Sequence, residues 1–175
     1  PHRNAITSPG IPRCYMVSQL DVERQLGEVM DPEVPVLSIV DLGLVRSVQV
    51  SNSDIHLGIA PTYTGCPAMD VIHDRIREAL APLGLPVHIK PEIHPPWTTD
   101  WMSEAGKKKL EAYGIAPPVG KASDKRSLWS PSPTVRCPRC KSDNTALISL
   151  FGSTACKSLY QCRSCDEPFD YFKCF

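Results

Sequence analysis

The cysteines near the C-terminal end constrain the fold of this chain more than any other feature. Six of the eight cysteines fall in the last 39 residues, and four of them form two CxxC pairs separated by 21 residues. Each CxxC turn aims two thiolates at one point, and two such turns joined by a hairpin complete the tetrahedral sulfur shell that zinc prefers. The spacing therefore predicts a C-terminal zinc ribbon whose ligands are Cys137, Cys140, Cys162 and Cys165.

The zinc ion of such a ribbon is expected to be structural. About forty residues bury little apolar surface, whereas zinc binding to a small domain contributes roughly 10–16 kcal/mol. Segments 145–151 and 169–172 have the composition of strands and are expected to form the ribbon. Two disulfides are the alternative. Cysteines crowded at one end of the chain, without a secretion signal, favour a metal over disulfides.

Cys156 and Cys174 lie beside the four predicted zinc ligands but have no place in a closed four-sulfur site. They could be buried thiols, a disulfide with each other, or extra ligands that turn the tail site towards iron–sulfur chemistry. The residue pattern alone leaves these three possibilities open.

Composition bounds the class of protein. The 175 residues suit one ordinary domain or two small ones. The 19 basic and 19 acidic side chains cancel, which argues against a protein that binds nucleic acid or membranes mainly through charge. The longest apolar runs are far shorter than the roughly 18 residues of a membrane helix. The first ten residues contain no apolar segment typical of a secretion signal, so we expect a cytoplasmic protein.

Charge and proline content divide the chain. Residues 1–120 hold 10 basic and 14 acidic side chains, a net charge of −4, whereas residues 121–175 hold 9 basic and 5 acidic side chains, a net charge of +4. The segment between them is rich in proline and serine and is expected to be a linker, with Leu128 and Trp129 docking onto a neighbouring surface. The predicted divisions are an N-terminal tail 1–17, a first domain 18–116, a linker 117–134 and the ribbon 135–175.

Hydrophobic periodicity predicts alternating helices and strands in the first domain. Apolar residues recur at helical spacing after Ser18, a capping residue, up to Asp31-Pro32, where the proline disfavours helix in the preceding residue. Pro67 opens a second amphipathic helix. The order α-β-β-α-β-α predicts a small α/β sandwich with helices on a short sheet, so the whole chain is expected to be α+β. The other expected elements are strands 45–50, 55–59 and 87–89 and a last helix 103–113.

Cys66 stands alone in the segment PTYTGCP, where a strand ends and a helix starts. Unpaired backbone N–H groups and the positive end of the helix stabilise a thiolate at such a position. Thr62 and Thr64 add hydroxyls that could hydrogen-bond to the sulfur or to a bound ligand. Asp31 and Glu33 could provide oxygen ligands or a base near the thiol. The alternative is that Cys66 is a small buried hydrophobic residue.

Several short segments resemble the SufT-like family of metal–sulfur cluster assembly factors. The resemblance spans roughly residues 18–116 and implies that Cys66 is a transient iron–sulfur ligand with Asp31 and Glu33 near it. Stand-alone members of that family lack a cysteine tail. The segments that carry the resemblance are DPEVP at 31–35, SI at 38–39, DLGLV at 41–45, GCP at 65–67 and PW at 96–97.

Longer segments are similar to the PaaD-type phenylacetate-degradation proteins, and this similarity accounts for the tail. Such proteins are encoded with the bacterial 1,2-phenylacetyl-CoA epoxidase, whose oxygenase component holds a di-iron centre and whose reductase carries flavin and an iron–sulfur cluster. The resemblance implies a non-catalytic accessory protein that helps to load or maintain a metal centre of the oxygenase or reductase component. Cys156 and Cys174 belong to the matching pattern, which makes them candidates for function. The segments concerned are 61–72, 98–101, 151–157 and 169–174.

These observations lead to three functional hypotheses. In the first, Cys66 carries a labile iron–sulfur cluster or iron for the epoxidase while the ribbon docks the client. One cysteine per domain is then enough only if a second protomer or a partner provides further ligands, so a homodimer or a client-bound form is expected. In the second, the ribbon is an interaction module for protein; nucleic acid is not expected, because lysine and arginine form no stripe. In the third, Cys66 is a catalytic nucleophile, which would need a base such as His56 or His73.

Overall fold

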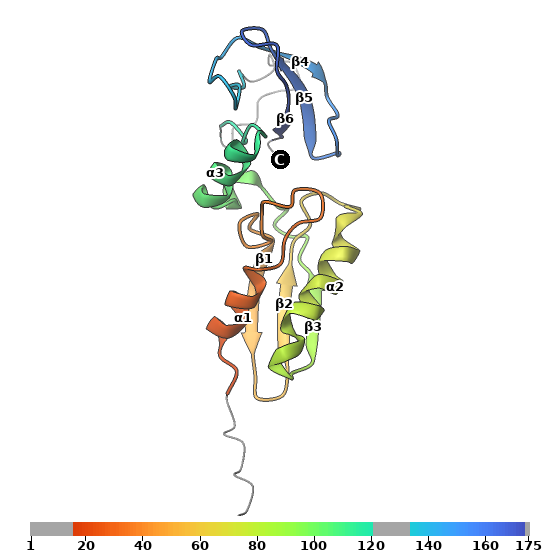
Figure 1. The fold of residues 1–175 in the computed structure, drawn as a ribbon. Helices are drawn as coiled ribbons and strands as arrows, with labels where there is room; N and C mark the ends of the chain where they lie inside the picture. Colours follow the sequence, from red (N-terminus) through yellow and green to blue (C-terminus); the bar gives the residue numbers. More distant parts are fainter. Residues whose placement is uncertain (1–15, 121–133, 174–175) are drawn as a thin grey trace, which may run out of the picture.

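A computed structural model describes residues 16–120 and 134–173 of the chain (Figure 1). Residues 1–15, the linker residues Leu128 and Trp129, and Cys174 lie outside the described residues. No helix within the described ranges is long and apolar enough to cross a lipid bilayer. The α+β class and the α-β-β-α-β-α order are confirmed by the elements, which are α1 (Gln19–Leu26), β1 (Val45–Val50), β2 (Ile55–Ile59), α2 (Ala68–Leu80), η1 (Ala81–Leu83), β3 (Val87–Pro91), η2 (Thr99–Trp101), α3 (Glu104–Tyr113), β4 (Thr145–Ser149), β5 (Lys157–Cys162) and β6 (Pro168–Phe172).

The first sheet has the strand order β1-β2-β3. β1 and β2 form an antiparallel hairpin, closed by a turn in which the Ser51 amide donates to the Asp54 carbonyl at 2.9 Å. β3 lies parallel to β2, and α2 makes the crossover that a parallel pair requires. This topology places the loop that carries Cys66 directly after the central strand β2.

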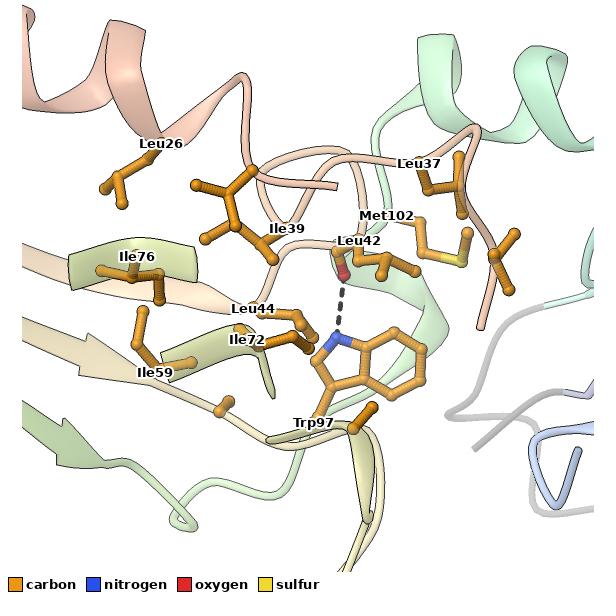
Figure 2. Packing of buried hydrophobic residues seen from close by; sticks show 14 of the residues in the cluster. Leu26, Leu37, Ile39, Leu42, Leu44, Ile59, Ile72, Ile76, Trp97 and Met102 are labelled. Atoms are coloured by element: carbon orange, nitrogen blue, oxygen red, sulfur yellow. Dashed lines mark hydrogen bonds between the residues drawn. The ribbon is translucent and has the colours of Figure 1, made fainter. Parts of the chain in front are cut away.

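α1 and α2 pack on this sheet, and their apolar side chains form the main core (Figure 2). Leu26 of α1 and Ile72 and Ile76 of α2 are at most 1% exposed. The Trp97 Nε1 atom donates to the Leu42 carbonyl at 2.9 Å, which ties the segment after β3 to the loop before β1. We call residues 16–116, with this sheet and its helices, the α/β unit.

α1 ends earlier than the sequence predicted. The helix starts after Ser18, whose hydroxyl caps it as expected, but its last residue is Leu26 rather than the residue before Asp31-Pro32. Beyond Leu26 the chain turns, and the Asp31 amide donates to the Leu37 carbonyl at 2.9 Å, next to an isolated antiparallel bridge. These contacts need an extended backbone, so the helix cannot continue through them.

The second sheet, which we call the ribbon (residues 134–173), is antiparallel with the order β4-β5-β6. The two strands predicted from the sequence are present as β4 and β6, but the central strand β5 was not predicted. Tyr160 of β5 stacks on Phe169 with 5.9 Å between ring centroids and meets Tyr171 edge-on at 5.6 Å. These rings form a separate small core beside the cysteine pairs.

The ribbon is docked on the α/β unit through main-chain and apolar contacts. After α3 the chain runs beside β6, where the Ala116 amide donates to the Asp170 carbonyl at 2.8 Å and the Phe172 amide donates to the Ala116 carbonyl at 2.9 Å. The Phe172 side chain is 1% exposed and packs in the core of the α/β unit, edge-on to Trp97 at 6.3 Å. The turn between β4 and β5 consequently faces the loop before α2 (Figure 1).

Candidate metal centres

The four cysteines predicted to bind zinc converge at one end of the ribbon. Their sulfur atoms all lie within 4.8 Å of one another, with 3.9 Å between the Sγ atoms of Cys137 and Cys165 and 3.4 Å between those of Cys140 and Cys162. A tetrahedron with zinc–sulfur bonds of about 2.3 Å has sulfur atoms about 3.8 Å apart. The arrangement therefore fits a structural zinc ion. These separations are far longer than a disulfide bond of about 2.05 Å, so the disulfide alternative is wrong for these four cysteines.

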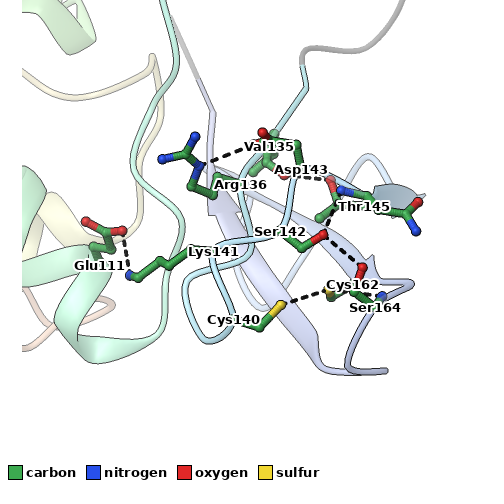
Figure 3. Close-up of polar contacts among 11 residues, drawn as sticks. Glu111, Val135, Arg136, Cys140, Lys141, Ser142, Asp143, Thr145, Cys162 and Ser164 are labelled. Carbon is green, nitrogen blue, oxygen red and sulfur yellow. Dashed lines mark hydrogen bonds and ion pairs between the residues drawn. The ribbon is translucent and has the colours of Figure 1, made fainter.

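The two CxxC turns are built alike. The residue after each pair, Lys141 or Asp166, has a positive φ angle of 62° or 58°. The Ser164 amide lies 3.4 Å from Cys162 Sγ and donates to it (Figure 3). Burial raises the pKa of the Cys162 thiol, but this backbone donor and the Cys165 amide outweigh it and lower the pKa to about 7. The turns thus prepare thiolates for the metal.

Cys66 lies in the tight turn that leads from β2 to α2. Gly65, with φ of +81°, takes the left-handed conformation that favours glycine, and the Cys66 amide donates to the Tyr63 carbonyl at 3.3 Å. α2 begins at Ala68, so Pro67 is its N-cap rather than its first residue, one position later than predicted. Cys66 is half-buried and carries a free thiol.

A small cavity of about 10 Å³ brings Cys66 together with most of the residues predicted to assist it. Asp31, Glu33 and Thr62 line this cavity, whereas Thr64 is exposed and is not among the lining residues. Cys156 of the ribbon lines it too, away from the four-sulfur site. The remaining lining residues are Val34, Leu42 and Phe172.

Asp31 holds the shape of the loop that presents Glu33. Its Oδ1 atom accepts hydrogen bonds from the Glu33 and Val34 amides, both at 2.8 Å, and the residue is 7% exposed. Such a carboxylate-capped turn fixes the backbone of the next two residues. Asp31 therefore positions Glu33 at the wall of the cavity as well as lining it.

Cys156 is almost completely buried, at 5% exposed. Its Sγ atom lies 3.8 Å from Glu33 Oε2 and 3.0 Å from Thr154 Oγ1. Burial raises the pKa of the Cys156 thiol, and the Thr154 hydroxyl opposes that shift. Of the possibilities left open for Cys156, the structure therefore excludes ligation of the ribbon's zinc and places the thiol beside Cys66.

Tyr63 and Lys157 also belong to this site, and neither was predicted from the sequence. Burial, and then the nearby Cys66 side chain with which its hydroxyl hydrogen-bonds, raise the pKa of Tyr63 to about 12. Lys157 is 4% exposed, and its Nζ atom lies 3.4 Å from the Glu33 carbonyl and 3.8 Å from Asp170 Oδ2. Both residues lie in segments that carried the family resemblance, next to the two cysteines, and this adjacency was the available signal.

The histidines considered as bases lie elsewhere. No histidine is among the described residues that line the Cys66 cavity. His56 is on the open face of the first sheet, where it stacks on His88 at 4.8 Å and lies 3.4 Å from Asp54. Burial lowers the pKa of His73, which is on α2. Neither position provides Cys66 with a base.

Comparison with known proteins gives matches to both parts of the chain. The family model described as the PaaD zinc beta ribbon domain matches residues 121–173, and the model described as iron-sulfur cluster assembly protein matches residues 19–89. A solved domain of unknown function, DUF59 from Bacillus anthracis, is 27% identical with a TM-score of 0.50, covering 53% of this chain and 90% of that chain.

Two relatives of known sequence match at higher identity. "Fe-S protein maturation auxiliary factor YitW" of Bacillus subtilis (strain 168) is 40% identical over 90 residues, 49% of this chain and 85% of that protein. A protein of Escherichia coli (strain K12) named as a 1,2-phenylacetyl-CoA epoxidase component of the PaaD type is 50% identical over 150 residues, which cover 85% of this chain and 88% of the relative. The chain therefore belongs to the PaaD family of phenylacetyl-CoA epoxidase components.

Proposed function

We propose that this chain is a non-catalytic accessory component of a 1,2-phenylacetyl-CoA epoxidase that accepts labile iron or an iron–sulfur cluster at Cys66. It passes this cargo to the metal centres of the oxygenase or reductase component. The observation that carries the proposal is the cavity in which Cys66 lies with the carboxylates of Asp31 and Glu33, in a chain of the PaaD family. Its relatives named as Fe-S maturation factors support the same role.

The geometry suits a carrier better than a permanent metal centre. The zinc site has four converging sulfurs, which is a saturated shell that releases its metal slowly. The Cys66 cavity combines a half-buried thiol with carboxylates that are also used to shape the loop. Fewer and weaker ligands allow a metal to leave for a site with a fuller shell.

The polar groups of the cavity do not favour catalysis by a cysteine nucleophile. Such catalysis needs a base within hydrogen-bonding reach of the thiol and a third group that orients the base. Carboxylates, a threonine and a second thiol line the cavity within the described part of the chain, and His56 and His73 are on other surfaces. The thiols are therefore assigned to metal binding rather than to covalent chemistry.

The ribbon surface supports protein contacts more than contacts with nucleic acid. Its basic side chains form ion pairs with carboxylates, so little positive charge is left to attract phosphates. The pairs are Arg136 with Asp143, Arg139 with Glu167, Lys141 with Glu111 and Lys157 with Asp170.

The experiment is to produce the epoxidase components together with the wild-type chain, with the Cys66→Ser variant, or without the chain. We expect the oxygenase or reductase component to contain less iron, and to epoxidise more slowly, in the second and third cases. Val71→Ser is the matched control, because Val71 is 44% exposed on α2 and lies outside the cavity. Equal iron content in all preparations would refute the proposal.

A further inference from the structure

The cavity beside Cys66 receives one thiol from each sheet. Cys66 comes from the loop before α2, and Cys156 comes from the residue just before β5 of the ribbon. Both line the cavity with Glu33, whose Oε2 atom is 3.8 Å from Cys156 Sγ. Within the described residues this pair is separate from the zinc ligands, which group only with one another.

We infer that Cys66, Cys156 and Glu33 form one metal site, completed when the ribbon docks, that takes a single thiophilic divalent cation of the ferrous class. This inference rests on the proposed function and specifies the cargo that the docked chain holds. Two thiolates and a carboxylate form a mixed sulfur and oxygen donor set, in which thiolates favour iron or zinc over magnesium or calcium. Ribbon docking then has a direct role, because it delivers the second thiolate.

The charges around the cavity favour a cation. Burial raises the pKa of the Cys156 thiol, and the carboxylates of Glu33 and Asp31 raise it further because like charges oppose ionisation. A divalent cation among these groups removes that repulsion and keeps the coordinating thiols deprotonated. Lys157, held on the Glu33 carbonyl and near Asp170, fixes the ribbon side of the cavity in place.

The size of the cavity selects a single ion over a cluster. Its volume is about 10 Å³, which is roughly that of one water-sized probe. This space suits one ion in contact with its sulfur and oxygen ligands. A cluster of two irons and two sulfides needs more space, so a cluster could bind at Cys66 only after the ribbon moves away.

The second thiolate comes from the same chain, which changes the expected oligomeric state. A homodimer was expected because one cysteine per domain leaves a metal short of ligands. With Cys156 in the cavity, two thiolates are present in a monomer, and metal binding no longer needs a second protomer.

The test uses the full chain with zinc in the ribbon, kept free of oxygen, and one equivalent of Co²⁺ as the probe. Wild type is expected to give a sulfur-to-cobalt charge-transfer band with the intensity of two thiolates. Cys66→Ser and Cys156→Ser should each halve the band and weaken cobalt binding by about tenfold or more. Glu33→Gln should keep the band and weaken binding. A full-strength band in Cys156→Ser would overturn the inference.

A second measurement needs no variant, so misfolding cannot obscure it. Dibromobimane becomes fluorescent when its two arms have each reacted with a thiol, and zinc protects the four ribbon ligands from it. We expect one intramolecular link between Cys66 and Cys156, identified by mass spectrometry in monomeric protein. Labelling of the two cysteines on separate reagents would contradict the inference.

The two proposals fail in different ways. If Cys66→Ser stops iron delivery to the epoxidase while Cys156→Ser binds cobalt like wild type, the shared site is refuted and the proposed function stands. If wild type binds cobalt through two thiolates but the epoxidase is loaded equally without the chain, the proposed function is refuted and the site stands. Zinc content and Val71→Ser serve as the folding and position controls throughout.

Discussion

Phe172→Ala tests whether the ribbon is held on the α/β unit by a side chain that leaves the ribbon's own core. Phe172 belongs to β6 but is buried with the residues of the α/β core, at 1% exposed. Truncating a fully buried phenylalanine costs about 3–5 kcal/mol, which includes the cavity left behind. The edge-on contact with Trp97 at 6.3 Å, worth about 0.5–1.5 kcal/mol, is part of this loss.

The loss should open the interface and expose Cys156. Each 1.4 kcal/mol changes an equilibrium constant about tenfold, so about 3 kcal/mol raises the undocked population roughly 100-fold. Cys156 is 5% exposed in the docked state and should react with a thiol reagent mainly from the undocked state. When redocking is faster than labelling, the labelling rate follows the undocked population. The Cys156 labelling rate should therefore rise by up to about 100-fold.

The assay follows Cys156 modification by mass spectrometry in zinc-loaded protein, alongside denaturant unfolding. Phe151→Ala is the matched control, because Phe151 is 67% exposed and contacts Lys173 only through a cation–π interaction at 4.7 Å. Its unfolding free energy should fall by about 1 kcal/mol or less, with the labelling rate unchanged. Equal labelling rates in the two variants, with zinc content intact, would refute docking through Phe172.

Three further predictions concern stability. Cys140→Ser should lose the zinc ion and leave the ribbon open to proteolysis while the α/β unit stays resistant, as limited digestion would show; a protected ribbon would contradict a structural zinc. Burial raises the pKa of Asp41, but hydrogen bonds, chiefly from Lys109 at 2.6 Å, outweigh it and hold the pKa below its usual value. Asp41→Asn should therefore unfold about 1–3 kcal/mol more easily at neutral pH, and this difference should shrink as the pH falls below about 4 in denaturant titrations. Gly43→Ala should destabilise far more than Gly84→Ala, since both have positive φ but a Cβ atom at Gly43 would lie 2.3 Å from a backbone oxygen, whereas nothing lies within 4 Å at Gly84; equal melting temperatures would contradict this.

The parts of the structure that follow from local spacing were predictable from the sequence. The two CxxC pairs place their thiolates together through turns of a few residues, so the zinc ligands could be named without a fold. Helices and strands of the α/β unit follow from the periodicity of apolar residues, which is also a local property. Cys66 could be placed before α2 because glycine and proline flank it.

The parts that depend on contacts between distant segments were not predictable. The end of α1 is set by backbone pairing with residues further along the chain, and β5 has no clear alternation because both of its ends are buried. The position of Cys156 depends on the docking of Phe172 and on Lys157 reaching the Glu33 carbonyl. These contacts join residues more than 100 positions apart, and no sequence period records them.

A site divided between two docked parts links metal affinity to docking. A ligand that binds only the docked state stabilises it by about 2.7 kcal/mol at a concentration of 100 times its Kd. Cobalt at that concentration should therefore offset most of the roughly 3 kcal/mol lost in Phe172→Ala.

The amide of Ala116 reports docking without involving a metal ligand, because it donates to the Asp170 carbonyl across the interface. Its hydrogen exchange should be faster in Phe172→Ala than in wild type, and saturating cobalt should return it close to the wild-type rate. Calcium, which prefers oxygen ligands, is the matched control and should have no effect. If cobalt binds through two thiolates while exchange at Ala116 stays fast, the cation does not join the two parts. By the same linkage, any client surface that pulls the ribbon away must weaken the hold on the metal by the factor that the metal adds to docking.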